Sequence, residues 1–166
     1  MSFVSIENTS ARKVASMLLD IGAIKLNHKN PFTWSSGWKS PVYCDNRLAL
    51  SYPKIRSFVK ESLVNLIKKN FSDSEYIAGV ATAGIPQGTL VADALGLPFV
   101  YVRPKPKEHG MSNLIEGRIE AGKKAVMIED LISTGGSSLK AAQAMEEAGF
   151  KVIGMAAIFK IGRAHV

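Results

Sequence analysis

The sequence has little of what marks several large classes of protein. Its one cysteine, Cys44, cannot form an internal disulfide, which excludes the cysteine framework of small secreted domains. Its apolar runs are broken by Gly, Lys or Asp well short of the roughly 18 residues that a membrane-spanning helix needs. The N-terminus does not place a basic segment before an apolar one, as a secretory signal does. We therefore expect a cytoplasmic chain with no membrane partner.

Several motifs of nucleotide-binding and hydrolytic enzymes are also missing. The chain contains no G-x-x-x-x-G-K-[S/T] loop, no G-x-G-x-x-G after the first predicted strand of its second half and no G-x-S-x-G turn. Its three histidines, His28, His109 and His165, are scattered, and no Cys/His cluster has the spacing of a metal site. These absences argue against a P-loop enzyme, a dinucleotide-binding enzyme and a zinc protein.

The composition is that of a folded domain with an excess of positive charge. The 166 residues are 46% hydrophobic and 21% charged without a repeat, which suits one domain spanning residues 1–166. The net charge of +7 points to an anionic partner, which nucleic acid, an acidic membrane and a polyphosphate substrate would each satisfy. Most lysines fall in helical patterns, where they occupy solvated faces.

One basic segment differs from the rest. The run R-P-K-P-K-E-H-G contains Arg103, Lys105, Lys107 and His109 and has no apolar periodicity. It has no evident packing role, so it is either a soluble loop or an anion-binding one.

Apolar periodicity predicts helices and a hairpin in the first half of the chain. The segments are a helix from Ala11 to Ile21, antiparallel strands between Ala23 and Asn46, and a helix from Pro53 to Lys69. Thr9 or Ser10 would cap the first helix, and Gly22 would end it.

In the second half, short apolar runs alternate with helical patterns. The predicted strands are Tyr76–Ala81, Pro98–Arg103, Ala125–Asp130 and Val152–Phe159, and the predicted helices are Ile85–Leu95 and Ser137–Ala148. This alternation indicates an α/β fold with a parallel sheet, in which ligands bind at the carboxyl ends of the strands. Three unusual segments follow strand ends, and we expect them to converge: 82–88, 103–110 and 129–137.

The segment A-V-M-I-E-D-L-I-S-T-G-G-S-S, residues 125–138, carries the clearest chemistry. Its glycines let the backbone approach an anion, its Ser and Thr hydroxyls donate hydrogen bonds, and the first helical turn supplies free amides. A plain strand-to-helix turn with a serine cap would look similar, but it would not explain Glu129 and Asp130. Two adjacent carboxylates are costly unless they bind cations or hydroxyls. Beside a phosphate site, they predict binding of a sugar phosphate.

Four segments resemble those of a known enzyme family. Residues 125–138 resemble the phosphoribosyl pyrophosphate (PRPP) motif of type I phosphoribosyltransferases. Three further segments resemble bacterial orotate phosphoribosyltransferases: F-T-W-S-S-G-W-K-S-P-V-Y-C-D-N-R at 32–47, G-V-A-T-A-G-I-P at 79–86 and Y-V-R-P-K-P-K-E-H-G at 101–110. The resemblance covers nearly the whole chain to Phe159. It implies the type I phosphoribosyltransferase fold, a central and mostly parallel sheet flanked by helices, with a small N-terminal hood of a helix and antiparallel strands.

The resemblance also implies how PRPP is held. Glu129 and Asp130 would bind the ribose hydroxyls. The 5-phosphate would be held by Leu131, Ile132, Ser133, Thr134, Gly135, Gly136 and Ser137. The pyrophosphate would meet the backbone of Thr82, Ala83 and Gly84 and the side chains of Arg103, Lys107 and His109. The catalytic candidates are Lys107, His109 and Asp130.

Orotate would be contacted by Ser133, Phe32 and Lys39. The implied reaction is a pentosyl transfer from PRPP to orotate that gives orotidine 5′-monophosphate and pyrophosphate, a step of pyrimidine (UMP) biosynthesis. Mg²⁺ would be the cofactor, held mainly by substrate oxygens rather than by a metal site of the protein. Residues 105–115 would form a mobile lid that reaches the partner subunit's active site, which implies a homodimer.

The chain departs from the family pattern in three places. Ala83 and Pro104 stand where some members have lysine, so fewer cations would contact pyrophosphate. The last segment, K-I-G-R-A-H-V, resembles nothing in the family and indicates a truncated or altered C-terminus. Within one domain, we therefore expect a hood-like region at 1–50, a PRPP-binding core at 51–159 and an atypical tail at 160–166.

Three alternatives stay open at this point. A transferase for a purine or another pyrimidine would share the PRPP motif, although the segment 32–47 argues against it. A PRPP-binding regulator would use the positive charge on DNA, but the chain shows no helix-turn-helix, and we expect no nucleic-acid partner. The third alternative is an inactive, truncated fragment.

Overall fold

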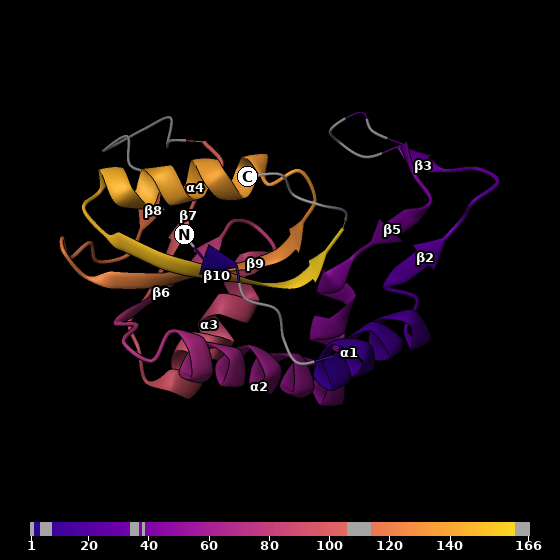
Figure 1. Cartoon of the computed structure of the whole chain (residues 1–166), viewed down its shortest axis with the longest axis horizontal. Coiled ribbons are helices and arrows are strands. Elements are labelled where there is room, and N and C mark those ends of the chain that lie inside the picture. The colour runs from indigo at the N-terminus through magenta and orange to yellow at the C-terminus, as the bar shows by residue number, and fades with distance from the viewer. Residues whose placement is uncertain (1, 4–7, 34–36, 38, 106–113, 162–166) are drawn as a thin grey trace. The chain divides into compact units, whose positions relative to one another are not determined.

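A computed structural model gives the fold of the chain (Figure 1) and describes all residues except 1, 4–7, 34–36, 38, 106–113 and 162–166. The chain divides into two compact units, residues 6–59 and residues 1–5 with 60–166. The second unit carries the strands whose ends were predicted to converge. Among the described residues, no helix combines the length and the apolar character of a membrane span.

The unit of residues 6–59 holds one helix, two short antiparallel ladders and a 3-10 turn. Its elements are α1 (Asn8–Asp20), β2 (Ile24–Leu26), β3 (Phe32–Thr33), β4 (Lys39–Ser40), β5 (Val42–Cys44), η1 (Asn46–Ser51) and the start of α2 (Pro53–Asn70). β2 pairs with β5 and β3 pairs with β4, both antiparallel. The predicted hairpin region is thereby confirmed.

The sequence predicted the C-terminal end of α1 correctly and its N-cap wrongly. The helix begins at Asn8, so Thr9 and Ser10 lie in its first turn, and their assignment as N-cap was wrong. Short polar side chains are common both at a cap and in the turn after it, so residue type did not separate these positions. At the other end Gly22 has φ +69°, and the Ala23 amide donates to the Leu18 carbonyl at 2.9 Å. This bond closes a left-handed glycine C-cap, as predicted.

The second unit is built on a six-stranded sheet in the order β1-β10-β9-β6-β7-β8. The strands are β1 (Ser2–Phe3), β6 (Tyr76–Val80), β7 (Phe99–Val102), β8 (Ile115–Glu116), β9 (Lys124–Ile132) and β10 (Lys151–Lys160). All neighbours are parallel except β8, which runs antiparallel to β7. The predicted α/β class and mostly parallel sheet are confirmed.

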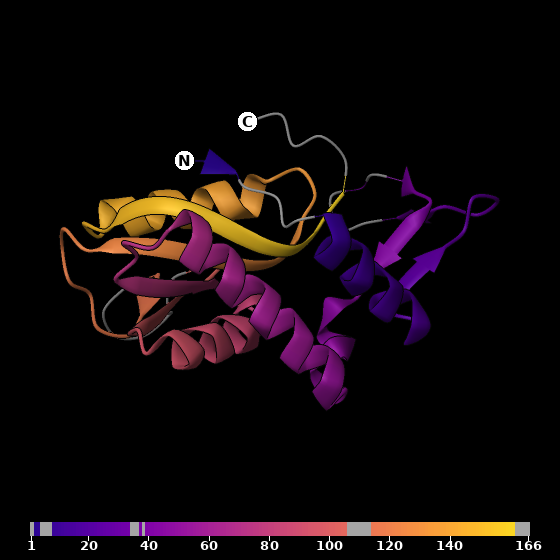
Figure 2. The same cartoon turned by 60° about the horizontal axis from the view of Figure 1, so that its bottom comes forward.

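Helices cover both faces of this sheet (Figures 1 and 2). α4 (Gly136–Glu147) lies on one face, and α3 (Gly84–Leu95) lies on the other with residues 60–70 of α2. Pro53 begins α2, where its fixed φ suits a helix and its missing amide costs nothing. At the other end of that helix, the Phe71 ring lies against Gly154 of β10 and leaves no room there for a Cβ.

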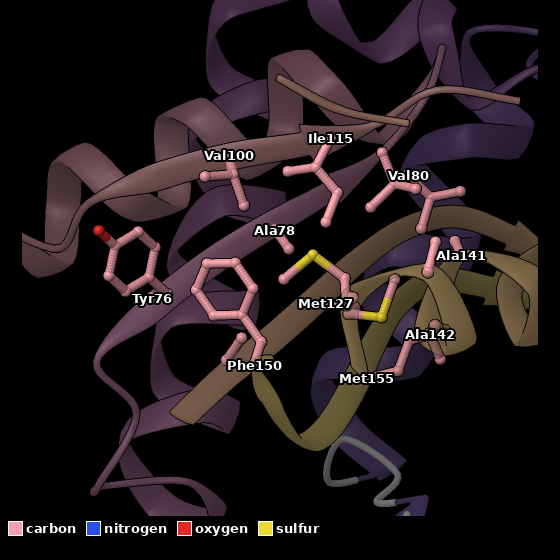
Figure 3. Packing of buried hydrophobic residues seen from close by; sticks show 14 of the residues in the cluster. Tyr76, Ala78, Val80, Val100, Ile115, Met127, Ala141, Ala142, Phe150 and Met155 are labelled. Carbon is pink, nitrogen blue, oxygen red and sulfur yellow. The ribbon is translucent and has the colours of Figure 1, made fainter. Parts of the chain in front are cut away.

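The core beneath α4 consists of alternate residues of the central strands (Figure 3). Tyr76, Ala78 and Val80 come from β6, and Met127 comes from the same face of β9. In the figure the two labelled methionines lie between the Tyr76 and Phe150 rings and the alanines of α4. Burial of this apolar surface fixes α4 against the sheet, and with it the turn that precedes α4.

Candidate functional site

β9 is longer than the sequence predicted, and this length forms the site. Its pairing with β6 ends at Gly79 and Ile128, whereas its pairing with β10 continues to Lys160 and Ile132. Glu129 and Asp130 therefore lie within the strand, whereas the sequence predicted them at its last two positions. In this stretch β9 is paired with β10 but no longer with β6. Such a step at the carboxyl edge of a parallel sheet is where α/β proteins bind ligands.

The loop after β6 packs closely beside that stretch. Residues 81–83 lead into α3, the Ala81–Thr82 peptide bond is cis, and the Ala81 amide donates to the Val102 carbonyl at 2.9 Å. Gly84 is buried, and a Cβ there would overlap the carbonyl oxygen of Ile128. The predicted pyrophosphate loop and the carboxylate strand are thus in direct backbone contact.

Glu129 is a buried acid with two hydrogen-bond donors. It is only 5% exposed. The Ser138 Oγ donates to its Oε2 at 3.2 Å, and the Asp130 amide donates to its Oε1 at 3.1 Å. Ser138 is itself buried, so its hydroxyl is directed to Glu129 and not to the phosphate oxygens that the sequence suggested.

Burial raises the pKa of Glu129 to about 8, and a hydrogen bond with the Asp130 carboxyl and its negative charge act in the same direction. The bonds from the Asp130 amide and from Ser138 oppose this shift without cancelling it. Burial therefore favours the protonated form of Glu129 in the unliganded protein at pH values where an exposed carboxyl is ionised. The negative charge of the adjacent Asp130 carboxyl repels a second charge on Glu129 and so disfavours its ionisation.

The turn between β9 and α4 has the backbone of an anion site. Gly135 adopts φ +81° and is the N-cap of α4, and no side chain caps the helix. The first amides of a helix have no acceptor within it, so these N–H groups point outward with the positive end of the helix dipole. Thr134 and Ser137 are exposed beside them. The sequence placed the helix start one residue later, but the predicted cradle is present.

Arg103 lies at the end of β7, on the predicted basic segment. Its amide donates to the Leu114 carbonyl at 2.7 Å, and its guanidinium pairs with Glu116 of β8 at 3.4 Å. A groove of about 570 Å³ opens beside it, between the ends of β6 and β7 and the side of α4. Arg103 and Ser137 line this groove and belong to two of the three segments that were predicted to converge, and Ala81 lines it directly before the third.

Four predicted site residues lie outside the described part of this unit. Lys107 and His109 lie outside the described residues. Phe32 and Lys39 belong to the other unit, where Phe32 packs against Tyr43 with ring centroids 5.5 Å apart and Lys39 is exposed. Their assignment to the base stays a prediction.

The structure adds residues that sequence reasoning missed. Glu116 pairs with Arg103 from a two-residue strand too short to show periodicity. Ser138 was recognised only as one hydroxyl among several. Its position three residues before Ala141 and four before Ala142, on the buried face of α4, was the available signal.

Comparison with known proteins identifies relatives of this arrangement. Residues 51–165 match the family model described as the phosphoribosyl transferase domain. An orotate phosphoribosyltransferase of Cytophaga hutchinsonii is 58% identical over 151 residues, which cover 91% of this chain and 72% of that protein. One of Bacteroides fragilis is 61% identical over 151 residues, covering 91% and 71%. The crystal structure of orotate phosphoribosyltransferase from Aeropyrum pernix superposes with a TM-score of 0.75 at 26% identity, covering 89% of this chain and 93% of that one.

Proposed function

We propose that the chain transfers the 5-phosphoribosyl group of PRPP to orotate. The premise is its family: the chain belongs to the phosphoribosyl transferase domain family and, within it, to the orotate phosphoribosyltransferases. The products are orotidine 5′-monophosphate and pyrophosphate. One observation carries the proposal beyond the family. The carboxyl pair on β9, with Glu129 buried and Asp130 half-buried, is followed along the chain by the uncapped start of α4 at Gly136, an order that suits a ribose and its 5-phosphate.

In this proposal each part of the site meets one part of PRPP. Glu129 and Asp130 accept hydrogen bonds from the ribose hydroxyls. The 5-phosphate lies on the turn 131–137, where outward amides and the helix dipole favour an anion. The backbone of 82–84 and the guanidinium of Arg103 meet the pyrophosphate.

The chemistry needs no nucleophile from the protein. The bond from the anomeric carbon to the pyrophosphate oxygen breaks, and pyrophosphate leaves with the electron pair. A bond from an orotate ring nitrogen to that carbon forms, and the proton of that nitrogen passes to the leaving pyrophosphate or to water. Positive charge builds on the ribose and negative charge on the leaving group, so fixed charges and positioning lower the barrier. Lys107 and His109 are assigned, with Arg103, to stabilise the leaving pyrophosphate.

Mg²⁺ fits this site as an ion carried by the substrate. Among the described residues, no three His, Cys, Asp or Glu side chains gather around one point. Mg²⁺ commonly keeps several waters and binds through substrate phosphates, so oxygens of PRPP would hold it. When bound, the ion neutralises charge on the pyrophosphate.

Assembly and base contacts belong to the same proposal. We assign Ser133, Phe32 and Lys39 to orotate and propose a homodimer in which residues 105–115 reach the partner's site, in a cytoplasmic protein. Arg103 and Lys105 are the cations of the basic segment that the structure describes, and Ala83 and Pro104 add none. Cations from a second subunit would add to the positive charge that contacts the pyrophosphate.

Orotate consumption is the direct test of the function. With PRPP and Mg²⁺, the chain is expected to consume orotate and release pyrophosphate. The loss of orotate absorbance measures the reaction. Adenine, hypoxanthine and uracil serve as comparison bases and are expected to react slowly or not at all. Faster reaction with any of these bases would reassign the specificity. Binding of PRPP without turnover of any base would favour a PRPP-binding regulator or an inactive fragment.

Asp130→Asn tests the ribose site. We expect the KM for PRPP to rise by roughly tenfold or more, because a hydrogen bond from a sugar hydroxyl to a charged acceptor contributes about 1.5–3 kcal/mol to binding. Steady-state kinetics at fixed orotate measures this change. The matched control is Asp93→Asn, an exposed carboxylate in the second half of α3, which is expected to behave as the parent chain. Unaltered PRPP affinity and turnover in Asp130→Asn would remove Asp130 from the site.

A further inference from the structure

Ser138 connects the two halves of the proposed ribose 5-phosphate site. It lies in the first turn of α4, the turn whose amides face the 5-phosphate, and it is 5% exposed. Its Oγ donates a hydrogen bond of 3.2 Å to Oε2 of Glu129, nine residues earlier on β9. Packing does not require a hydroxyl at this position. The other buried residues of α4, namely Ala141, Ala142, Ala144 and Met145, are all apolar.

The two donors of Glu129 fix how its carboxyl is turned. The Asp130 amide binds Oε1 at 3.1 Å and Ser138 binds Oε2. When Glu129 is ionised, its carboxylate has about four acceptor positions, and these two donors occupy one on each oxygen. The amide bond belongs to the backbone of β9 itself, whereas the Ser138 bond comes from another element. Without Ser138 the carboxyl group could turn about its last side-chain bond.

We propose that Ser138 is a positioning residue, whose hydroxyl holds the Glu129 carboxyl in the orientation that receives ribose hydroxyls and ties it to the helix turn that binds the 5-phosphate. This inference rests on the proposed function of the site. It distinguishes Ser138 from Ser137, which is exposed and is assigned to the phosphate directly. Loss of the Ser138 hydroxyl then weakens recognition of the sugar and spares recognition of the phosphate.

The test compares two probes on the same protein by titration calorimetry. Ribose 5-phosphate engages both halves of the site, and inorganic phosphate engages only the turn. For Ser138→Ala, we expect the Kd of ribose 5-phosphate to rise about tenfold, the size of one lost hydrogen bond to a charged group, with the Kd of phosphate changed by less than about twofold. Ser138→Thr retains the hydroxyl and is expected to restore binding of ribose 5-phosphate.

Two further variants separate positioning from general damage. Ser62→Ala removes a buried hydroxyl from α2 and is expected to leave both Kd values unchanged. Ser138→Cys keeps nearly the same volume with a weaker donor, and it is expected to show the same selective loss even if the alanine variant folds poorly. Equal loss of both probes in the Ser138 variants, or no loss of either, would overturn the positioning role.

The pH dependence gives a second readout that a packing role would not move. The Ser138 hydrogen bond lowers the pKa of Glu129, whereas the adjacent Asp130 carboxyl raises it. In Ser138→Ala, the pH at which ribose 5-phosphate reaches half of its maximal affinity should therefore shift upward. An unshifted profile would overturn the inference. Failure of the proposed function looks different, because the unaltered chain would then bind ribose 5-phosphate no better than phosphate.

Discussion

Glu129→Gln is expected to stabilise the protein at alkaline pH and to weaken its binding of PRPP. The pKa of Glu129 is raised from 4.5 to about 8 in the folded chain, mainly by burial. Between these values the unfolded chain has lost the proton and the folded chain keeps it. The folded state thus binds more protons, so stability falls as pH rises through this window and levels off above it. Glutamine does not titrate, so the variant should lack this decline.

The expected gain is largest above pH 8. Each pKa unit corresponds to about 1.4 kcal/mol, so the parent chain should lose on the order of 4 kcal/mol between pH 5 and pH 9 through this residue. Below pH 5 the two proteins should be about equally stable, because a protonated carboxyl and an amide are similar in size and polarity. Urea unfolding at pH 5, 7 and 9 measures the difference. Glu146→Gln, an exposed substitution on α4, is the control and should follow the parent chain at each pH.

Binding should change in the opposite direction. A sugar hydroxyl that donates to the ionised Glu129 has a weaker acceptor in glutamine, so PRPP affinity should fall by roughly 10- to 100-fold. In the parent chain kcat/KM for PRPP should rise with pH as Glu129 loses its proton, and in the variant this dependence should disappear. A stabilised but weakly binding variant would show that the buried acid is kept for function at a cost in stability. A parallel pH profile of stability in the two proteins would contradict the raised pKa.

The sequence predicted the arrangement of elements better than their ends. Continuous apolar strands alternating with helices were enough for the parallel sheet, and Pro53 and Gly22 marked helix ends because their backbone chemistry is local. β1 and β8 are two-residue strands whose pairing depends on distant partners, and no periodicity can appear over so short a length. Thr9 and Ser10 failed as caps for a related reason, since residue type alone does not fix the first helical residue.

The same distinction holds within the candidate site. The turn at 133–137 was predictable because glycine, hydroxyls and a helix start lie together in sequence. The pairing of Glu129 with Ser138 and of Arg103 with Glu116 was not, because each joins two elements that only the packed core brings together. The family resemblance named Glu129 and Asp130, but only the folded structure shows that burial, with the adjacent Asp130 carboxyl, raises the pKa of Glu129.

Gly84→Ala is expected to destabilise the fold and to disrupt the pyrophosphate loop together. The backbone of Gly84 lies against β9 where β6 has ended, and an added Cβ would overlap the Ile128 carbonyl oxygen, next to the Cα of Glu129. Neither neighbour is a flexible side chain, so a backbone segment must move. Overpacking of this kind costs roughly 1–3 kcal/mol, and we expect a loss of stability of that size.

The functional effect of Gly84→Ala should exceed what the lost stability explains. Moving α3 away from β9 displaces the amides of residues 82–84 from the carboxyl groups of Glu129 and Asp130. A shift of about 1 Å in a positioned group can lower the rate on the order of 100-fold. We expect kcat/KM for PRPP to fall by at least about tenfold at a temperature where the variant is fully folded. Gly136→Ala is the control for stability, since its Cβ would meet only the Thr134 Oγ1 at 3.9 Å, and it should unfold at the same urea concentration as the parent chain. If Gly84→Ala were as stable and as active as the parent chain, the contact between the β6 loop and β9 would not set the geometry of the site.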